Sequence, residues 1–387
     1  MRRFAFSGLA AGLVALALPA AAADCANFYG DKCRVKLSTG ITLSYVDQGP
    51  RDGMPVIFLH GYTDSSLEFV TTAAALAARD KTLRLLALDQ RGAGETDLPD
   101  TAICRSTPSR CITNAARVAD VAAFLDALKL PKAVLVGHSM GSVVARGAAL
   151  AAPSLVAKLV LIGTPAPLPA GQAGMAGLPG LDKTGGEGPL DPAFWQKSAA
   201  ERGLAWPQGV YNLRLLDLDP DAVADLARYW DISTVAPAEF SRAIAAQTAT
   251  VKLKFWDIDR TPIELPAEPL DHLAVPTLVL WGTQDSIMTK AAQDKLIGTL
   301  KAAAAAHPGM RFTWKQYGVR PLDASGQQTD DIGHEIVWEA SAELAADLDS
   351  FIRTGAPTLD LYRTDAPADL HRIVTEPGKA ITVSAGR

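Results

Sequence analysis

The sequence predicts an α/β fold, in which a mostly parallel sheet is flanked by helices and a helical cap is inserted between two of the strands. Two observations support this prediction. Short apolar runs alternate with helix-like stretches, which is the pattern of βαβ units and therefore of a parallel sheet. The alternation then stops between residues 168 and 271, in a block too long for a simple connection between strands.

Six apolar runs have the length and composition of strands that are covered on both faces of a sheet. They are residues 55–59, 83–88, 133–136, 158–162, 277–280 and 311–317. Ahead of them, residues 34–38 and 41–46 alternate between apolar and polar positions. This alternation predicts an antiparallel hairpin that turns at Thr39 and Gly40.

Helix-like stretches lie between the predicted strands. The strongest is residues 114–128, in which apolar side chains recur every three or four positions. The others are residues 67–78, 140–152 and 335–353. The inserted block starts with a stretch rich in proline and glycine and continues as helix-like segments, so we expect a helical cap at residues 168–271.

Domain boundaries follow from these elements. We expect the core of the α/β fold to comprise residues 24–167 and 272–353, separated by the cap at 168–271. Residues 354–387 contain repeated prolines and no clear periodicity. No role is assigned to this C-terminal tail.

Residues 1–23 have the features of a signal peptide. Arg2 and Arg3 precede an apolar run at residues 4–18, and small residues follow at 20–23, where an A-x-A cleavage site is expected. The apolar run is shorter than the ~20 residues that span a bilayer. We therefore expect a periplasmic or secreted protein with no membrane span after signal cleavage. An anchor that stays attached is the alternative.

The composition disfavours nucleic acid as a partner. The chain carries 37 Lys and Arg against 42 Asp and Glu, a net charge of −5. Such a chain has no overall attraction for a polyanion. A hydrophobic content of 48% supports a globular core rather than general disorder.

The four cysteines occur as two local pairs, Cys25 with Cys33 and Cys104 with Cys111. In an exported chain, an even number of cysteines indicates disulfides. Four cysteines allow three connectivities, and the local pairs are favoured because short loops keep their ends close. Zinc binding is the alternative, but neither pair has the C-x-x-C spacing that is typical of zinc ligands.

The most informative motif is GHSMG at residues 137–141, which fits the pattern G-x-S-x-G. It follows the apolar run 133–136 and opens a helix of small residues. In this position a strained strand-to-helix turn exposes the Ser139 hydroxyl, the glycines prevent clashes, and the helix N-terminus stabilises negative charge. Ser139 is therefore the predicted nucleophile. A serine that only caps the helix is the alternative.

A second motif, HGY at residues 60–62, follows the apolar run 55–59. A chain that turns there can point the backbone N–H of Tyr62 at the site. Together with the N–H of Met140 it would form an oxyanion hole for acyl transfer. An ordinary glycine turn is the alternative.

Residues 89–96, DQRGAGET, resemble the D-x-R-G-x-G-x-S segment of the α/β-hydrolase superfamily. With HGY before it and GHSMG after it, the chain is similar to the esterase, lactonase and C–C hydrolase branches over roughly residues 35–353. The resemblance implies an α/β-hydrolase fold with the inserted block in the family's usual cap position. DQRG also resembles proline iminopeptidases, but their HGGPG segment is replaced by HGYTD at residues 60–64, which disfavours a peptidase.

The resemblance also implies a chain order of nucleophile, acid and base, which leaves three candidates for the base: His307, His334 and His371. His307 lies in an alanine-rich stretch before the last predicted strand, and His371 lies in the unassigned tail. His334 follows that strand and precedes a helix, where the family places its base. His334 is the predicted base.

Asp285 is the predicted acid, because it follows the strand at 277–280 through a short turn. Some members of the family place the acid one strand earlier. Here no carboxylate follows residues 158–162 until Asp182, which favours Asp285. Asp330 and Asp331 are alternatives, but they lie close to His334 in sequence and would need a tight bend.

Together these residues predict a serine hydrolase that cleaves a carboxylic ester or lactone, in a small molecule or a polymer, through an acyl-enzyme. The alternatives are cleavage of a diketone-type C–C bond by the same triad, a peptidase, or a non-catalytic binding protein on this fold. An epoxide hydrolase or dehalogenase would normally need an aspartate in place of Ser139.

We infer no cofactor. The glycine clusters at residues 92–94 and 171–177 do not complete a dinucleotide or phosphate fingerprint. A metal cluster formed by Asp330, Asp331, His334 and Glu335 is a weaker alternative, since no second group with ligand spacing accompanies it.

Overall fold

A computed structural model gives the fold. It describes residues 25–61, 64–96, 98–106, 111–166, 270, 273–282, 285, 288, 290–307, 310–317, 334–358, 372–376 and 379–382. The predicted signal peptide at 1–23 and almost all of the predicted cap at 168–271 lie outside these residues. Both remain predictions.

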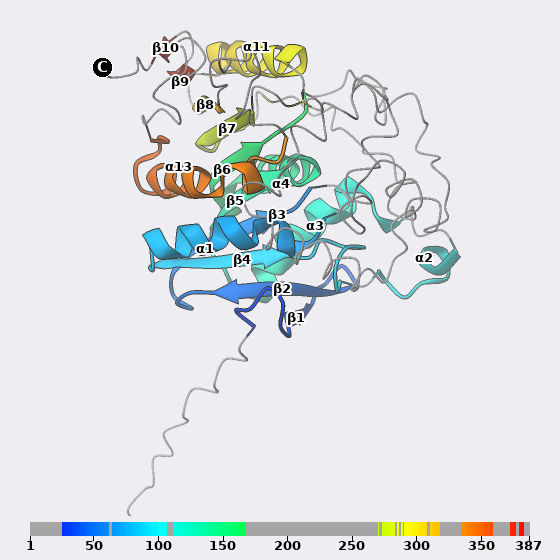
Figure 1. Ribbon diagram of the computed structural model, residues 1–387. Coiled ribbons are helices and arrows are strands. Elements are labelled where there is room, and N and C mark those ends of the chain that lie inside the picture. The colour runs from blue at the N-terminus through cyan, green and yellow to red at the C-terminus, as the bar shows by residue number, and fades with distance from the viewer. Residues whose placement is uncertain are drawn as a thin grey trace, which may run out of the picture.

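A ten-stranded sheet runs through the described part of the chain, in the order β1-β2-β4-β3-β5-β6-β7-β8-β9-β10 (Figure 1). The strands are β1 (Cys33–Lys36), β2 (Thr42–Gln48), β3 (Met54–Leu59), β4 (Leu83–Leu88), β5 (Ala133–His138), β6 (Val156–Ile162), β7 (Thr277–Gly282), β8 (Phe312–Tyr317), β9 (Arg372–Glu376) and β10 (Lys379–Thr382). Strands β4, β3, β5, β6, β7 and β8 pair in parallel, while β1, β2, β9 and β10 add antiparallel pairs at the two edges.

The predicted mostly parallel sheet is therefore confirmed. All six apolar runs are strands, and the N-terminal hairpin forms with Gly40 at a φ of 89°, a conformation that glycine adopts without strain. β4, β5, β7 and β8 are buried along their whole length. Strands covered on both faces have no solvent side to alternate with, which explains why β4, β5 and β7 are mostly apolar, whereas β8 also buries Thr313, Lys315 and Gln316.

Helices cover both faces of this sheet (Figure 1). α1 (Val70–Arg79) and α13 (Ser341–Thr354) pack against each other on one face, and α3 (Asn114–Ala127) and α4 (Met140–Ala151) pack against each other on the opposite face. The first turn of α3 is capped by Thr113, whose side chain accepts a hydrogen bond from the Ala116 N–H at 3.1 Å.

The remaining helices are short or were not expected. The 3₁₀ helices are η1 (Ser66–Phe69) and η3 (Pro153–Leu155), and the short α-helices are α2 (Ala102–Ser106) and α12 (Ile336–Glu339). The single helix predicted at 335–353 is thus two helices, α12 and α13, which meet at Ala340. α11 (Lys290–Ala306) was missed, because a run of alanines gives no apolar periodicity to detect.

The C-terminal tail takes part in the sheet, which the sequence did not indicate. β9 pairs antiparallel with β8, and β10 pairs antiparallel with β9. The hairpin thus extends the sheet beyond the last parallel strand (Figure 1).

β6 and β7 are neighbours in the sheet although the inserted block separates them in sequence. The block therefore leaves and re-enters the fold between two adjacent parallel strands. Among the described helices, none combines the length and the apolar character needed to cross a membrane.

Both disulfides join the local cysteine pairs, Cys25 with Cys33 and Cys104 with Cys111. Their Cα atoms lie 5.2 Å and 5.6 Å apart, within the usual range for a disulfide.

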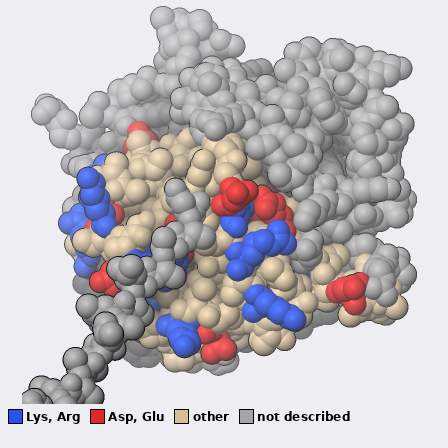
Figure 2. Space-filling view, turned by 90° about the horizontal axis from the view of Figure 1, so that it is seen from below, with Lys and Arg blue, Asp and Glu red and all other residues tan. Residues whose placement is uncertain are grey.

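The charged residues on the face seen in Figure 2 are of both signs and lie among each other, so this face presents no single-sign patch for a polyanion.

Each disulfide loop also anchors the turn that follows β4. Lys32 is next to Cys33 and donates a hydrogen bond to the buried carboxylate of Asp89 at 2.7 Å. The guanidinium of Arg91 donates to the backbone carbonyl of Cys111 at 3.0 Å. The start of the DQRGAGET segment is therefore bonded to both disulfide loops, one that precedes it in the chain and one that follows it.

The disulfide pairing gives the first testable prediction. Protein purified from an oxidising compartment and then unfolded should show no titratable thiol, and peptide mapping should recover Cys25–Cys33 and Cys104–Cys111. In the chain-entropy model, loops this short contribute roughly 2–3 kcal/mol each to the free energy of unfolding. A recovered Cys25–Cys104 peptide, or a free thiol, would contradict the pairing.

Candidate active site

Ser139 occupies the turn between β5 and α4 with a strained backbone. Its φ is 48° and its ψ is −119°, in a region that non-glycine residues rarely adopt. The turn is held by the Ser139 N–H, which donates to the carbonyl of Ile162 at 2.9 Å. The side chain is only half-buried, so the turn presents the hydroxyl at the carboxyl edge of the sheet.

The two glycines of the GHSMG motif allow this turn to pack against its surroundings. A Cβ atom on Gly141 would lie 1.9 Å from the carbonyl oxygen of Leu59 on β3, and one on Gly137 would lie 2.3 Å from the carbonyl oxygen of Gly141. Neither backbone atom can move aside cheaply. Glycine is therefore required sterically at both positions, as the motif predicts.

His334 and Asp285 lie side by side. Nδ1 of His334 is 2.8 Å from Oδ2 of Asp285, and both side chains are buried. The other carboxylate oxygen of Asp285 accepts a hydrogen bond from the Met288 N–H at 2.6 Å, which fixes the plane of the carboxylate. Trp281 supports this turn by donating from its indole N–H to the Met288 carbonyl at 2.6 Å.

The turn after β6 leaves room for this pair. Gly163 has a φ of 53°, and a Cβ atom there would lie 3.1 Å from Cε1 of His334 and 3.5 Å from Oδ2 of Asp285. The two other candidates for the acid, Asp330 and Asp331, lie outside the described residues.

Backbone contacts bring the turn at Ser139 towards this pair, because the Ser139 N–H bonds to the Ile162 carbonyl and the next residue, Gly163, packs against His334. The ring of His138, the residue before Ser139, is 4.8 Å from the ring of His334, measured between centroids. Among the described residues, no hydrogen bond joins Oγ of Ser139 to His334. Hydrogen bonds between a nucleophile and its base are often long in a site without substrate and tighten when substrate binds.

Of the two predicted oxyanion donors, the structure describes one. Met140 is the first residue of α4, so its backbone N–H belongs to the N-terminal turn, whose donors have no partner within the helix. Tyr62 lies outside the described residues. The turn that leads to it is tied to the DQRG segment, because the Gln90 side chain donates to the His60 carbonyl at 2.7 Å and the Gln90 N–H donates to Nε2 of His60 at 3.0 Å. Burial lowers the pKa of His60 to about 4, which keeps its ring neutral and able to accept.

Behind Ser139 lies a buried pair that sequence reasoning missed, Glu68 and His138. Oε1 of Glu68 is 2.6 Å from Nδ1 of His138, and neither side chain is more than 1% exposed. Nε2 of His138 is 2.9 Å from the backbone carbonyl of His334. The only signal in the sequence was an acidic residue within the expected helix 67–78, a position that normally faces solvent.

Two buried carboxyls of this region have raised pKa values. Burial raises the pKa of Glu68 to about 8, and burial raises that of Glu335, the residue after His334, to about 7. Around Glu335, the negative charges of Glu68 and Asp64 act in the same direction, while His138 and His334 oppose them. Protons are therefore held here at a pH where exposed carboxyls have lost theirs.

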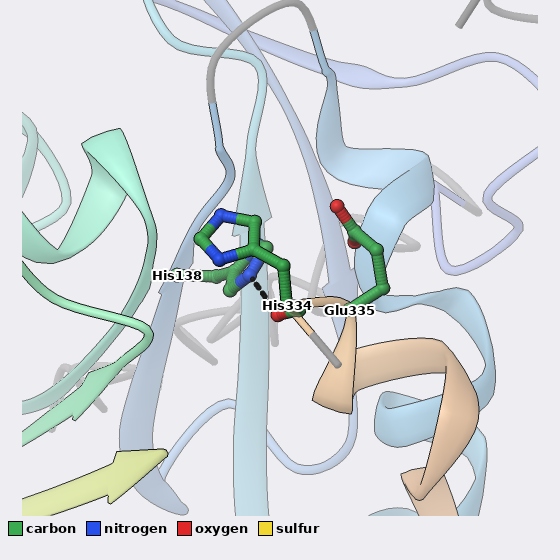
Figure 3. Close-up of side chains that lie close together, drawn as sticks. All are labelled: His138, His334 and Glu335. Carbon is green, nitrogen blue, oxygen red and sulfur yellow. Dashed lines mark hydrogen bonds between the residues drawn. The ribbon is translucent and has the colours of Figure 1, made fainter. Parts of the chain in front are cut away.

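His138, His334 and Glu335 bring possible metal ligands within 4.8 Å of one another. Figure 3 shows Nε2 of His138 pointing at the carbonyl of His334. Its other ring nitrogen contacts Glu68, and Nδ1 of His334 contacts Asp285. With both nitrogens of His138 engaged, this trio fits a hydrogen-bonded protein network better than a metal site.

Comparison with known proteins finds similar sequences of several enzyme types. Over 135 residues the chain is 38% identical to the non-heme chloroperoxidase of Streptomyces lividans, which covers 35% of this chain and 45% of that protein. Over 344 residues it is 24% identical to an epoxide hydrolase of Caballeronia sordidicola, which covers 82% of this chain and 92% of that protein. The chain spans less than half the length of the first curated relatives that it matches.

Among solved structures, the enol-lactonase from Burkholderia xenovorans LB400 has the same fold. It aligns with a TM-score of 0.53 at 20% identity, over 83% of this chain and 99% of that one. The family described as "alpha/beta hydrolase fold" matches residues 54–307, which include the nucleophile turn, Gly163 and Asp285. Since this match extends over more than half of the sequence, the chain belongs to the α/β-hydrolase family.

Proposed function

We propose that this protein is an exported serine hydrolase that cleaves a carboxylic ester or lactone, with Ser139 as nucleophile, His334 as base and Asp285 as the acid that orients the base. The observation that carries the proposal is the strained backbone of Ser139, with φ at 48°, beside a buried histidine–aspartate pair. Strain of this kind persists only where the surrounding structure imposes it, and it is concentrated at functional sites.

The proposed proton transfers follow from the hydrogen bond to Asp285. Because Nδ1 of His334 donates to that carboxylate, Nε2 is the nitrogen left to take the proton from the Ser139 hydroxyl. Attack on the ester carbonyl gives a tetrahedral oxyanion, which the N–H groups of Met140 and Tyr62 would stabilise. The protonated His334 then gives its proton to the leaving alcohol. Water repeats the sequence on the acyl-enzyme.

The nucleophile's identity favours ester chemistry over epoxide opening. Epoxide hydrolases are among the relatives, but the proposed nucleophile here is a hydroxyl and not a carboxylate. A serine nucleophile is suited to acyl transfer, in which its alkoxide adds to a carbonyl carbon. Export is supported by the N-terminal sequence and by two disulfides, which persist in oxidising compartments.

Ser139→Ala should abolish turnover of a panel of chromogenic esters with graded acyl lengths, because the alkoxide that attacks the carbonyl is lost. The same variant should fold normally, since alanine adds no atoms to the turn. A fluorophosphonate probe should label the wild-type protein and not the variant. Labelling that persists in the Ala variant would place the nucleophile elsewhere.

Asp285→Asn should lower kcat by up to ~10⁴-fold, by analogy with the serine-protease triad, because an amide facing Nδ1 favours the wrong tautomer of His334. The matched control is Asp294→Asn, which makes the same change on the exposed side of α11. Steady-state kinetics on the best substrate measures both. The assignment is wrong if Asp285→Asn keeps near-wild-type kcat while Asp330→Asn or Asp331→Asn loses it.

The raised pKa of Glu335, the residue after the proposed base, predicts how the free energy of unfolding depends on pH. Its pKa is about 7 in the folded protein and 4.5 in the reference state, so between these values the folded form holds a proton that the unfolded form releases. Stability should therefore fall as pH rises from 4.5 to 7, by about 3 kcal/mol at most from this group.

Glu335→Gln, which cannot ionise, should lose less thermal stability than wild type between pH 5 and pH 8. Glu343→Gln, on the exposed face of α13, is the control for removal of a carboxylate. Melting temperatures across the pH range provide the measurement. Parallel curves for wild type and Glu335→Gln would show that Glu335 does not hold its proton in the folded state.

A further inference from the structure

Glu68 and His138 connect three segments of the site, although neither takes part in the proposed chemistry. Nε2 of His138 contacts the carbonyl of His334 at 2.9 Å, and Nδ1 contacts Oε1 of Glu68 at 2.6 Å. The Gly61 N–H donates to both carboxylate oxygens of Glu68, at 3.2 Å and 3.1 Å. A continuous path of hydrogen bonds therefore runs from the turn that precedes Tyr62, past the nucleophile turn, to the backbone of the proposed base.

The partners fix where the protons must be. A carbonyl oxygen only accepts, so Nε2 of His138 carries a hydrogen and donates it to His334. Nδ1 and Oε1 then have one further proton between them, because without it two acceptors would face each other at 2.6 Å, and with two protons two donors would. This proton lies either on Oε1 of Glu68 or on Nδ1 of His138. The side chain of Asp64 also hydrogen-bonds Glu68, so a second carboxyl belongs to the same buried group.

We propose that Glu68 and His138 are positioning residues that share this single proton. They thereby hold the Gly61 turn and the backbone of His334 at fixed positions relative to Ser139. The role rests on the proposed function, since it concerns the same triad. Removing Glu68 leaves the Gly61 N–H without this buried partner, and removing His138 does the same to the His334 carbonyl. The backbone of His334 and the Gly61 turn can then shift relative to Ser139. Displacements of about 1 Å at such a site lower the rate by up to ~100-fold.

The first pair of variants changes Glu68. Glu68→Gln can replace the protonated carboxyl, because its amide N–H₂ donates to Nδ1 of His138 while its carbonyl accepts from Gly61. Glu68→Met has a similar length and no hydrogen-bonding hydrogen. We expect Glu68→Gln to stay within about threefold of the wild-type kcat, and Glu68→Met to lose about 10- to 100-fold with KM changed by less than about threefold.

The second pair of variants tests the two hydrogen bonds of the His138 side chain separately. The amide of a glutamine reaches about as far as Nε2, and the amide of an asparagine about as far as Nδ1. His138→Gln keeps the bond to the His334 carbonyl, whereas His138→Asn keeps only the bond to Glu68. We therefore expect kcat to fall further in His138→Asn than in His138→Gln.

Every kcat is expressed per active site titrated with the fluorophosphonate probe, so that a loss of folded protein does not count as a loss of rate. Thr277→Val is the control: it removes a buried hydrogen bond from Oγ1 to the Val275 carbonyl, 2.9 Å long, at the amino end of β7 and away from the site. It should lower the melting temperature and leave kcat per titrated site unchanged. A merely structural pair would behave in the same way.

The proposal is overturned if Glu68→Met and His138→Asn keep wild-type kcat per titrated site, or if Glu68→Gln loses as much as Glu68→Met. Failure of the proposed function looks different, because Ser139→Ala would then remain active. In that case thermal unfolding of Glu68→Met, His138→Asn and the double variant still decides whether the pair exists. A coupled pair loses less stability in the double variant than the sum of the two single losses.

Discussion

Parallel pairing of the central strands is the constraint on which the rest of the structure depends. In a parallel sheet the carboxyl ends of neighbouring strands meet at one edge, so the turns after β3, β5, β6 and β7 converge there. These turns supply Gly61, Ser139, Gly163 and Asp285, which the sequence scatters over more than 200 residues. His334, which follows β8, completes the group. The order and pairing of the strands therefore bring residues that are distant in sequence to one edge of the sheet.

Convergence alone would bring these turns into collision, and glycine is what permits it. The nucleophile turn packs so closely against the end of β3 that a single methyl group on Gly141 would overlap the Leu59 carbonyl. A methyl group on Gly163 would likewise press against the ring of His334. The absence of side chains at these glycines lets the groups of the candidate site lie close together, and Ser139 alone carries the strained backbone of its turn.

Close packing of these turns also buries carboxyl groups, and burial favours their neutral, protonated form. Glu68 and Glu335 lie in the layer beneath the proposed triad, and burial raises the pKa of each carboxyl. A neutral carboxyl can both donate and accept, so it can join segments that present only N–H groups or only lone pairs. The same property makes the stability of this layer fall as pH rises from about 4.5 through the raised pKa values of about 7 and 8, because the folded state loses its protons there.

The sequence by itself determined the order of the strands along the chain and the turn at Ser139, and it favoured the local disulfides. Each rests on a local pattern: an apolar run, a glycine spacing or a short loop. It also predicted Asp285 and His334, which the structure brings to 2.8 Å, although their roles remain proposals. Tertiary structure alone decided that β9 and β10 extend the sheet and that an alanine-rich segment is a helix. It alone placed Glu68 against His138, since a buried glutamate on a helix has no local signature. Its position depends on partners distant in sequence, and only the folded chain brings those partners together.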